Sequence, residues 1–225
     1  ASMDSILARG LTALSPGAVG EIVKHQEVLL LDTRPSPSFV RSFVPGSIWV
    51  GFGSTFDSWV SRLVMDSGQP LVIVADRGSE EGVISRLAGI GFDQVLGYLN
   101  GGLEAWADAG LATGSLMEVS PEVFSEISDP PTVTMLDVRS SAEYFCQHIE
   151  GARHFPVEAI ECQPDELDRD EAYFLYSQHG DRSTLAASLM LRQGFTQLVH
   201  VQGGFTEVKK WIQGVTPYRE PLLMW

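Results

Sequence analysis

The chain repeats several short motifs at nearly constant spacing, and this repeat limits the folds open to it. A repeat of about 100 residues is typical of a duplicated domain rather than of a solenoid. We therefore predict an N-terminal repeat (residues 1–115) and a C-terminal repeat (residues 116–225). The matching motifs, at offsets of 105, 105 and 102 residues, are Ser15-Pro16 with Ser120-Pro121, Leu31-Asp32-Thr33-Arg34 with Leu136-Asp137-Val138-Arg139, and Gly101-Gly102 with Gly203-Gly204.

Each repeat alternates short apolar runs with helical patterns. Continuous apolar strands with crossover helices are typical of a mainly parallel sheet flanked by helices. The predicted fold class is therefore α/β, with one such sheet in each repeat. Strands are predicted near 28–31, 71–74, 94–96, 133–136, 174–176 and 197–201, and helices near 81–88 and 184–193.

Two further expectations concern aromatic and apolar residues. Trp106 and Trp211 follow the paired glycines in helical patterns, which favours a place in the core for both. The tail from Pro217 to Trp225 is apolar at its end, and we expect it to pack on a domain or on a partner.

The composition argues against several classes of protein. The formal net charge is −14, which opposes the basic surface that nucleic-acid binding needs. No apolar run reaches the roughly 18 residues of a membrane span, and the N-terminus lacks a secretory signal pattern. The two cysteines, Cys146 and Cys162, are too few for a disulfide framework. We therefore expect a cytoplasmic protein that binds neither nucleic acid nor membrane.

One short loop in the C-terminal repeat has the composition of an anion site. Ser177-Gln178-His179-Gly180-Asp181-Arg182-Ser183 lies between a predicted strand and a predicted helix. Successive backbone N–H groups in such a loop, next to a helix N-terminus, form a cradle for an anion. Gly180 permits the tight backbone path, and Arg182 adds a planar cation. Such a cradle lowers the pKa of a thiol at its first position, but this chain has Ser177 there.

The loop resembles the active-site loop of rhodanese-type sulfurtransferases, Cys-x-x-Gly-x-Arg-Ser, with serine in place of cysteine. The resemblance covers nearly the whole chain as two rhodanese-like domains. It implies that Ser177 holds the position of the nucleophile, which passes a sulfane sulfur from a donor such as thiosulfate to an acceptor. The phosphatases of the same fold have a loop one residue longer, so a phosphatase is the weaker interpretation. The residues implied in the site are Ser177 and Arg182 for catalysis, and Gln178, His179, Gly180, Asp181 and Ser183 for binding the anion.

Ser177 changes what this site can do. Sulfur transfer needs a soft nucleophile that is ionised near neutral pH. A hydroxyl is a far weaker acid, and oxygen forms no stable equivalent of a persulfide. We therefore predict that the loop binds a small sulfur-containing anion or a persulfide without turning it over, and that it needs no cofactor.

The matching loop of the N-terminal repeat, Ala75 to Glu81, is more degenerate. Ala75 offers no nucleophile, and Glu80 places a negative charge where Arg182 stands in the other repeat. We predict a structural or pairing role for this repeat. The resemblance also implies that Asp137 and Arg139 support the active loop, which is compatible with a plain ion pair.

Two alternative chemistries fit the sequence less well. A serine nucleophile needs a positioned base. His179 is only two residues from Ser177 in the same tight loop, and no G-x-S-x-G elbow occurs. A metal site would draw on Cys146, His148, His154 and Cys162, whose spacing matches no familiar zinc pattern. No metal is therefore predicted.

The N-terminal repeat carries a narrower resemblance. Its motifs look like those of the first rhodanese domain in fusions with a metallo-β-lactamase-fold persulfide dioxygenase, which implies such a domain as a partner. The leading hypothesis is a sulfurtransferase-family protein of sulfane-sulfur metabolism, inactive as written. The alternative is a non-catalytic scaffold or interaction module. The motifs are Asp32-Thr33-Arg34-Pro35, Val44-Pro45-Gly46-Ser47, Phe56-Asp57-Ser58-Trp59-Val60 and Leu96-Gly97-Tyr98.

Overall fold

The computed structural model describes residues 2–25, 28–64, 66–128, 133–162, 164–212 and 214–216. Two compact units divide the chain, the N-terminal repeat (Ala1–Ser115) and the C-terminal repeat (Leu116–Trp225). The expectation for the apolar tail concerns residues 217–225, which lie outside the described set.

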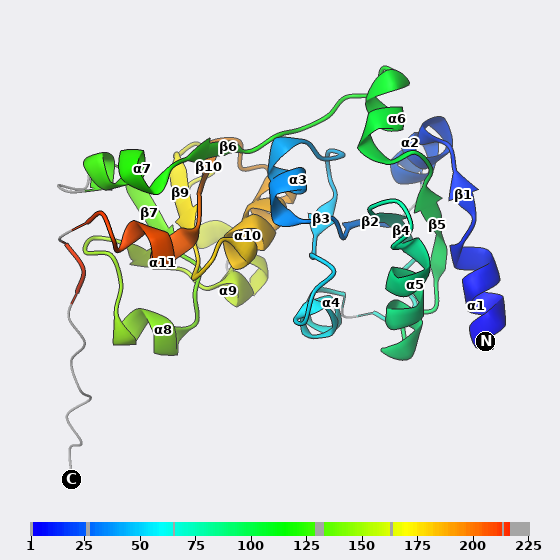
Figure 1. The fold of residues 1–225 in the computed structure, drawn as a ribbon, viewed down its shortest axis with the longest axis horizontal. Coiled ribbons are helices and arrows are strands. Elements are labelled where there is room, and N and C mark those ends of the chain that lie inside the picture. The colour runs from blue at the N-terminus through cyan, green and yellow to red at the C-terminus, as the bar shows by residue number, and fades with distance from the viewer. Residues whose placement is uncertain are drawn as a thin grey trace, which may run out of the picture. The chain divides into compact units, whose positions relative to one another are not determined.

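Each repeat contains a five-stranded sheet in which all paired strands run parallel, and both sheets have the same order (Figure 1). The order is β1-β5-β4-β2-β3 in the N-terminal repeat and β6-β10-β9-β7-β8 in the C-terminal repeat. This arrangement confirms the predicted α/β class. The strands are β1 (Ala13–Leu14), β2 (Leu29–Asp32), β3 (Ile48–Trp49), β4 (Leu71–Val74), β5 (Val95–Leu99), β6 (Met117–Val119), β7 (Thr134–Asp137), β8 (Arg153–His154), β9 (Tyr173–Tyr176) and β10 (Leu198–Val201).

Helices pack against each sheet in pairs. In the N-terminal repeat α1 packs with α5 and α2 with α6; in the C-terminal repeat α9 packs with α10 and α7 with α11 (Figure 1). Among the described residues, no helix combines the length and the apolar character that crossing a bilayer would require. The helices are α1 (Met3–Gly10), α2 (Pro16–His25), α3 (Ser36–Arg41), α4 (Phe56–Leu63), α5 (Glu80–Gly89), α6 (Gly102–Asp108), α7 (Pro121–Ser128), α8 (Ser141–Cys146), α9 (Val157–Cys162), the 3₁₀ turn η1 (Pro164–Glu166), α10 (Asp181–Arg192) and α11 (Gly204–Val208).

The apolar strands form the cores because helices cover them. Every residue of β2, β4 and β10 is buried, as expected for parallel strands covered on both faces. In the C-terminal repeat, Phe124 of α7 and Phe205 of α11 pack in one cluster with Tyr176 of β9. Because Tyr176 is the last residue of β9, this cluster adjoins the candidate loop that follows.

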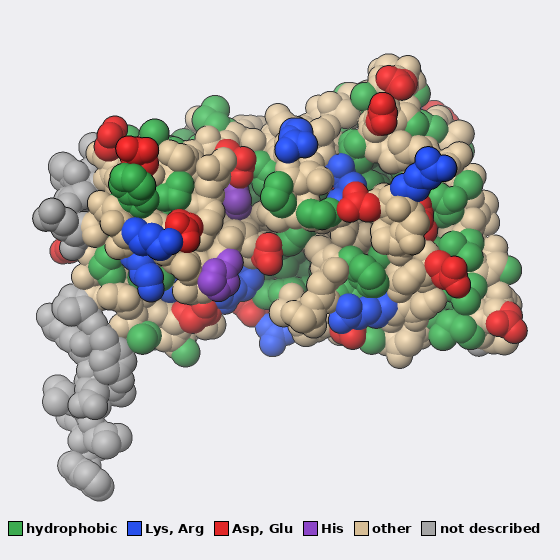
Figure 2. Space-filling model, in the orientation of Figure 1, with side chains coloured by type: hydrophobic (Ala, Val, Ile, Leu, Met, Phe, Trp, Pro, Cys, Tyr) green, Lys and Arg blue, Asp and Glu red, His purple; other side chains and the backbone are tan. Residues whose placement is uncertain are grey.

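The expectation that Trp211 lies in the core is wrong. Its side chain is 54% exposed, because α11 ends at Val208, before Trp211. At the offset of 102 residues, the place of Trp106 in the other repeat belongs to Val208, which is buried as Trp106 is. On the face of the molecule drawn in Figure 2, acidic and basic side chains are interspersed over both repeats.

Candidate active site

The loop of the C-terminal repeat lies at the carboxyl end of β9, where sheets of this type place their ligands. β9 ends at Tyr176 and α10 begins at Asp181, earlier than the start predicted near residue 184. Gly180 explains the early start, because its left-handed conformation (φ +112°) turns the chain directly into the helix. The loop proper is therefore 177–180, and Asp181, Arg182 and Ser183 form the first turn of α10.

Hydrogen bonds from α11 fix the orientation of the loop backbone. The Phe205 N–H donates to the Ser177 carbonyl over 2.7 Å, and the Thr206 N–H donates to the Gln178 carbonyl over 3.1 Å. In a trans peptide the carbonyl and the following N–H point in opposite directions. The N–H groups of Gln178 and His179 therefore point away from α11, into the loop.

Gly204 makes this close approach possible. A Cβ atom added at Gly204 would lie 2.2 Å from the Ser177 carbonyl oxygen, far inside van der Waals contact. Only glycine therefore lets the start of α11 reach the loop. The paired glycines were recognised as part of the repeat, but their contact with the loop was not predicted.

Ser177 lies at the centre of this arrangement. The residue is 1% exposed. Its Oγ accepts a hydrogen bond of 3.1 Å from the Gly180 N–H. The Ser183 hydroxyl lies 3.4 Å from Ser177 Oγ and donates to the Gly180 carbonyl over 2.8 Å. The Ser177 hydroxyl thus already accepts a hydrogen bond from a backbone N–H of its own loop.

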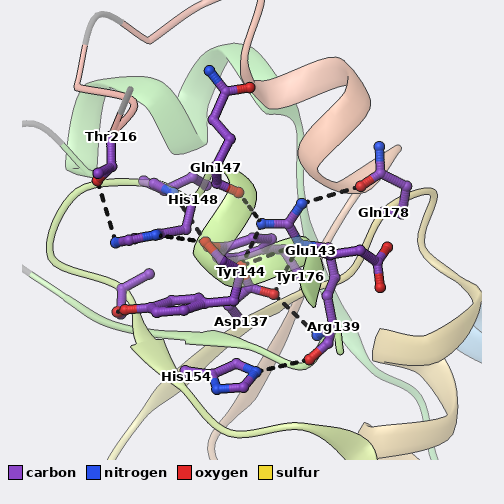
Figure 3. Close-up of polar contacts among 12 residues, drawn as sticks. Asp137, Arg139, Glu143, Tyr144, Gln147, His148, His154, Tyr176, Gln178 and Thr216 are labelled. Carbon is purple, nitrogen blue, oxygen red and sulfur yellow. Dashed lines mark hydrogen bonds and ion pairs between the residues drawn. The ribbon is translucent and has the colours of Figure 1, made fainter. Parts of the chain in front are cut away.

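Asp137 and Arg139 form a buried ion pair that also reaches the loop (Figure 3). Arg139 Nη2 lies 2.6 Å from Asp137 Oδ2 and 2.7 Å from the Gln147 carbonyl, and Nη1 donates to Gln178 Oε1 over 3.1 Å. Burial would lower the pKa of Arg139, but the hydrogen bond and charge of Asp137 outweigh burial and raise it. The guanidinium also stacks over Phe205, 4.0 Å from the ring centroid. Arg139 is thus a fixed cation that contacts the loop through Gln178.

Arg182 is paired with a carboxylate that the sequence analysis missed. Its two terminal nitrogens donate to the two oxygens of Glu143, on α8, over 2.5 and 2.6 Å. The hydrogen bond from Arg182 lowers the pKa of Glu143 to about 2. Glu143 also completes a capping box with Ser140 at the start of α8. The Ser-x-x-Glu spacing predicts that cap, but nothing in the sequence predicts the pairing with Arg182.

The other predicted binding residues lie around the loop with different exposure. Gln178 is half-buried and donates from Nε2 to Thr206 Oγ1 over 3.0 Å. His179 is exposed, with Nδ1 3.3 Å from the same Thr206 hydroxyl. Asp181 is exposed in the first turn of α10. Thr206 therefore joins two loop side chains, and it too was missed.

The four residues considered for a metal lie in different surroundings. Cys146 and Cys162 are free and exposed at the ends of α8 and α9. The rings of His148 and His154 stack on Tyr144, with centroids 3.8 and 4.5 Å away. His154 Nε2 also lies 2.9 Å from the Arg139 carbonyl (Figure 3). Both histidines thus support the segment around the Asp137–Arg139 pair.

The matching loop of the N-terminal repeat fills its own amide site. The Gly78 N–H donates to a carboxylate oxygen of Glu80 over 2.6 Å. The Asp32–Arg34 pair is present as in the other repeat, at 2.6 Å, and the Trp49 indole takes the place of His154 by donating to the Arg34 carbonyl over 2.8 Å. A Cβ atom at Gly102, the counterpart of Gly204, would meet nothing within 4 Å. The start of α6 at Gly102 therefore does not approach this loop as closely as the start of α11 approaches the loop of the C-terminal repeat.

Several known proteins resemble parts of this chain. A putative sulfur carrier protein, YrkF of Bacillus subtilis, is 32% identical over 94 residues, which are 41% of this chain and 51% of that protein. The thiosulfate sulfurtransferase GlpE of Actinobacillus pleuropneumoniae is 31% identical over 88 residues, 39% of this chain and 82% of that protein. The crystal structure of a thiosulfate sulfurtransferase from Pseudomonas aeruginosa is 17% identical and covers 93% of this chain and 44% of that one, with a TM-score of 0.43.

The relatives differ from this chain in extent, because it spans about half the length of YrkF. The family comparison covers far more of the chain. The rhodanese-like domain model matches residues 15–109 and again residues 120–210, once in each repeat. The chain therefore belongs to the rhodanese-like domain family.

Proposed function

We propose that the loop of the C-terminal repeat binds a small sulfur-containing anion, thiosulfate or a persulfide, as part of sulfane-sulfur metabolism. The observation that carries this proposal is the orientation of the loop backbone. Because α11 holds the carbonyls of Ser177 and Gln178 from outside, the N–H groups that follow them are directed inward, and the Gly180 N–H already donates to Ser177 Oγ. Gln178, His179, Gly180, Asp181 and Ser183 surround the anion, and Arg139 and Asp137 support the loop through Gln178.

The same loop with serine does not transfer sulfur. In a sulfurtransferase a thiolate attacks the sulfane sulfur of thiosulfate, sulfite leaves, and the resulting persulfide passes its sulfur to an acceptor. The Ser177 hydroxyl is not ionised near neutral pH and cannot hold a second sulfur. We therefore propose that this chain is a pseudoenzyme that binds sulfur anions, with Arg182 held in place by Glu143.

A non-catalytic scaffold is the second candidate, and two observations favour it. Glu143 already pairs with the Arg182 cation, and Glu80 already occupies the Gly78 amide of the other repeat. In this alternative both loops satisfy their own donors and bind no anion.

The leading proposal has two further parts. One is a cytoplasmic setting, suggested by two free, exposed cysteines, and the other is a metallo-β-lactamase-fold persulfide dioxygenase as a partner.

The test is sulfur transfer from thiosulfate to cyanide by the chain itself, by Ser177→Cys and by Ala75→Cys. We expect activity only in Ser177→Cys. The pH dependence of alkylation should give its thiol a pKa below the ordinary value of about 8.5. Ala75→Cys is the matched control, because it places a thiol at the same position of a loop whose amide is taken by Glu80. Inactivity of both variants, together with no binding of thiosulfate to the unmodified chain, would favour the scaffold.

A further inference from the structure

A buried histidine beneath the loop has no part in the chemistry described so far. His200 lies on β10 and is 4% exposed. Its Nδ1 is 3.0 Å from Glu118 Oε1, and its Nε2 is 3.2 Å from the Gly180 carbonyl and 3.3 Å from Thr184 Oγ1. Both ring nitrogens are therefore engaged, one with a carboxylate and one with the backbone of the loop.

The fold brings these groups together from three elements. β10 and β6 run parallel with His200 directly opposite Glu118, so their side chains share one face of the sheet. Gln202 holds the other Glu118 oxygen at 3.1 Å. Thr184 lies in the first turns of α10, and on β9 the residue opposite His200 is the apolar Leu175. Among the described residues that hydrogen-bond to the imidazole, the charged one is thus Glu118, whereas the groups from α10 and the loop are neutral.

The hydrogen-bond partners allow two states of the ring. A carboxylate only accepts hydrogen bonds, so Nδ1 carries a proton. In the neutral ring, Nε2 accepts from the Thr184 hydroxyl, and the Gly180 carbonyl keeps the Thr184 N–H at 3.0 Å and the Ser183 hydroxyl at 2.8 Å. In the charged ring, Nε2 donates to the Gly180 carbonyl, and the Thr184 hydroxyl donates to the same carbonyl over 3.1 Å. One proton therefore decides whether His200 binds the loop backbone directly.

The Gly180 carbonyl matters because of the N–H on the other side of the same peptide. The Asp181 N–H points opposite to the Gly180 carbonyl, away from His200 and toward the side where the loop receives its ligand. Fixing the carbonyl fixes this donor. A protonated His200 also places a positive charge beneath the loop, where it pairs with Glu118 as Arg182 pairs with Glu143.

We infer that His200, oriented by Glu118, is a positioning residue of the anion cradle and that the cradle takes up a proton on His200 when it binds its anion. The inference rests on the proposed anion-binding function. Because binding linkage is reciprocal, a ligand that favours the charged ring binds more tightly as pH falls through the range in which histidine titrates, about pH 5 to 8. The proton comes from solvent, and no bond of the anion changes.

The N-terminal repeat supports this assignment by contrast. The register positions of Glu118 and His200 are taken there by Ala13 and Tyr98, which are also opposite each other in the sheet. The repeat whose amide site is filled by Glu80 thus lacks both members of the pair. The Glu118–His200 pair thus occurs in the repeat that has the proposed anion cradle.

The experiment measures thiosulfate binding by calorimetry to the full chain at several pH values and in buffers of different ionisation enthalpy. His179 is a second histidine of the loop, so the whole series, the parent included, is also measured with His179→Gln. We expect binding to tighten about fivefold or more on acidification, with proton uptake. His200→Gln keeps an uncharged donor, so it should bind at high pH within about twofold of the parent and lose both the pH dependence and the uptake. His200→Leu should bind about tenfold more weakly throughout.

Nitrogen NMR of the His200 ring gives the direct readout, because a merely structural histidine would not change its protonation when thiosulfate is added. An unchanged ring, or the same pH dependence in His200→Gln, would overturn the inference. If His200→Leu fails to fold, Glu118→Gln takes its place, because position 118 is partly exposed. This variant should weaken thiosulfate binding and change the protonation of the His200 ring.

Failure of the proposed function would look different. If no anion binds at any pH, the positioning role is judged in the free protein by hydrogen exchange of the Asp181 amide. Faster exchange in Glu118→Gln and His200→Gln than in the parent supports the role, and equal exchange overturns it.

Discussion

The two repeats share a scaffold and differ in what surrounds one loop. Both have the same strand order, and both end the second strand of their sheet with a buried Asp–Arg pair. Around the loop, Arg182 and Glu143 are replaced by Glu80 and Ser38 at the matching positions, so both partners of the ion pair are changed together. The two loops therefore differ in the contacts that hold them from outside, as well as in their sequence.

The largest effect is expected from removing the arginine of the buried pair. Arg139→Met and Arg34→Met each leave a fully buried aspartate without its partner, which typically costs about 3–5 kcal/mol. Urea denaturation should show a similar loss of stability in both variants. Only Arg139→Met should also weaken thiosulfate binding, because only Arg139 contacts the loop through Gln178.

Adding the change of aspartate to asparagine in the same repeat should recover part of the stability, since no buried charge then remains. If the single variants lose less than about 1 kcal/mol of stability, the aspartates become protonated, and so neutral, when their arginines are removed. Equal loss of thiosulfate binding in the two variants would contradict a special role of Arg139 at the loop.

A smaller effect, and a sharper comparison, comes from the glycines that start the last helix of each repeat. Gly204 and Gly102 have nearly the same φ, +59° and +60°, so an alanine is strained at both by about 1 kcal/mol. Gly204→Ala also forces a Cβ against the Ser177 carbonyl, and we expect a total cost of about 3 kcal/mol. Thermal unfolding measures both, and thiosulfate binding should be lost only in Gly204→Ala. If the two variants lose the same stability, α11 moves away from the loop without a cost in stability.

The smallest effect is expected from Glu143→Gln. Because the folded-state pKa of Glu143 lies at about 2, below its ordinary value of 4.5, the pair stabilises the fold above about pH 4.5 and is lost as pH falls toward 2. The variant should therefore lose about 1 kcal/mol at neutral pH and show a weaker acid dependence in this window.

The same variant tests the balance of charge at the cradle. Releasing Arg182 from Glu143 should tighten thiosulfate binding by about threefold to tenfold. Glu122→Gln, at an exposed acidic position in the first turn of α7, is the control for the change of net charge. If the two variants bind thiosulfate alike, Arg182 does not act at the site.

Much of the fold followed from local patterns. The apolar run at residues 71–74 became β4 without change. The repeated Ser-Pro pairs mark helix starts, because proline is favoured at the first helical position, and α2 and α7 begin at Pro16 and Pro121. The loop at 177–180 was located because a strand, a glycine and a helix follow one another within a few residues. The start of α10 was misplaced because it depends on the left-handed conformation of Gly180, and the exposure of Trp211 was missed because α11 ends early.

The sequence by itself determined the duplication, the α/β class, the position of the loop and the absence of a cysteine from it, because each of these is carried by residues close together in the chain or by spacing. The tertiary structure alone decided the surroundings of the loop. Glu143 meets Arg182 across 39 residues, and Glu118 meets His200 across 82. Such contacts depend on which strands become neighbours and on how closely two backbones approach. No local sequence pattern carries information on either of these.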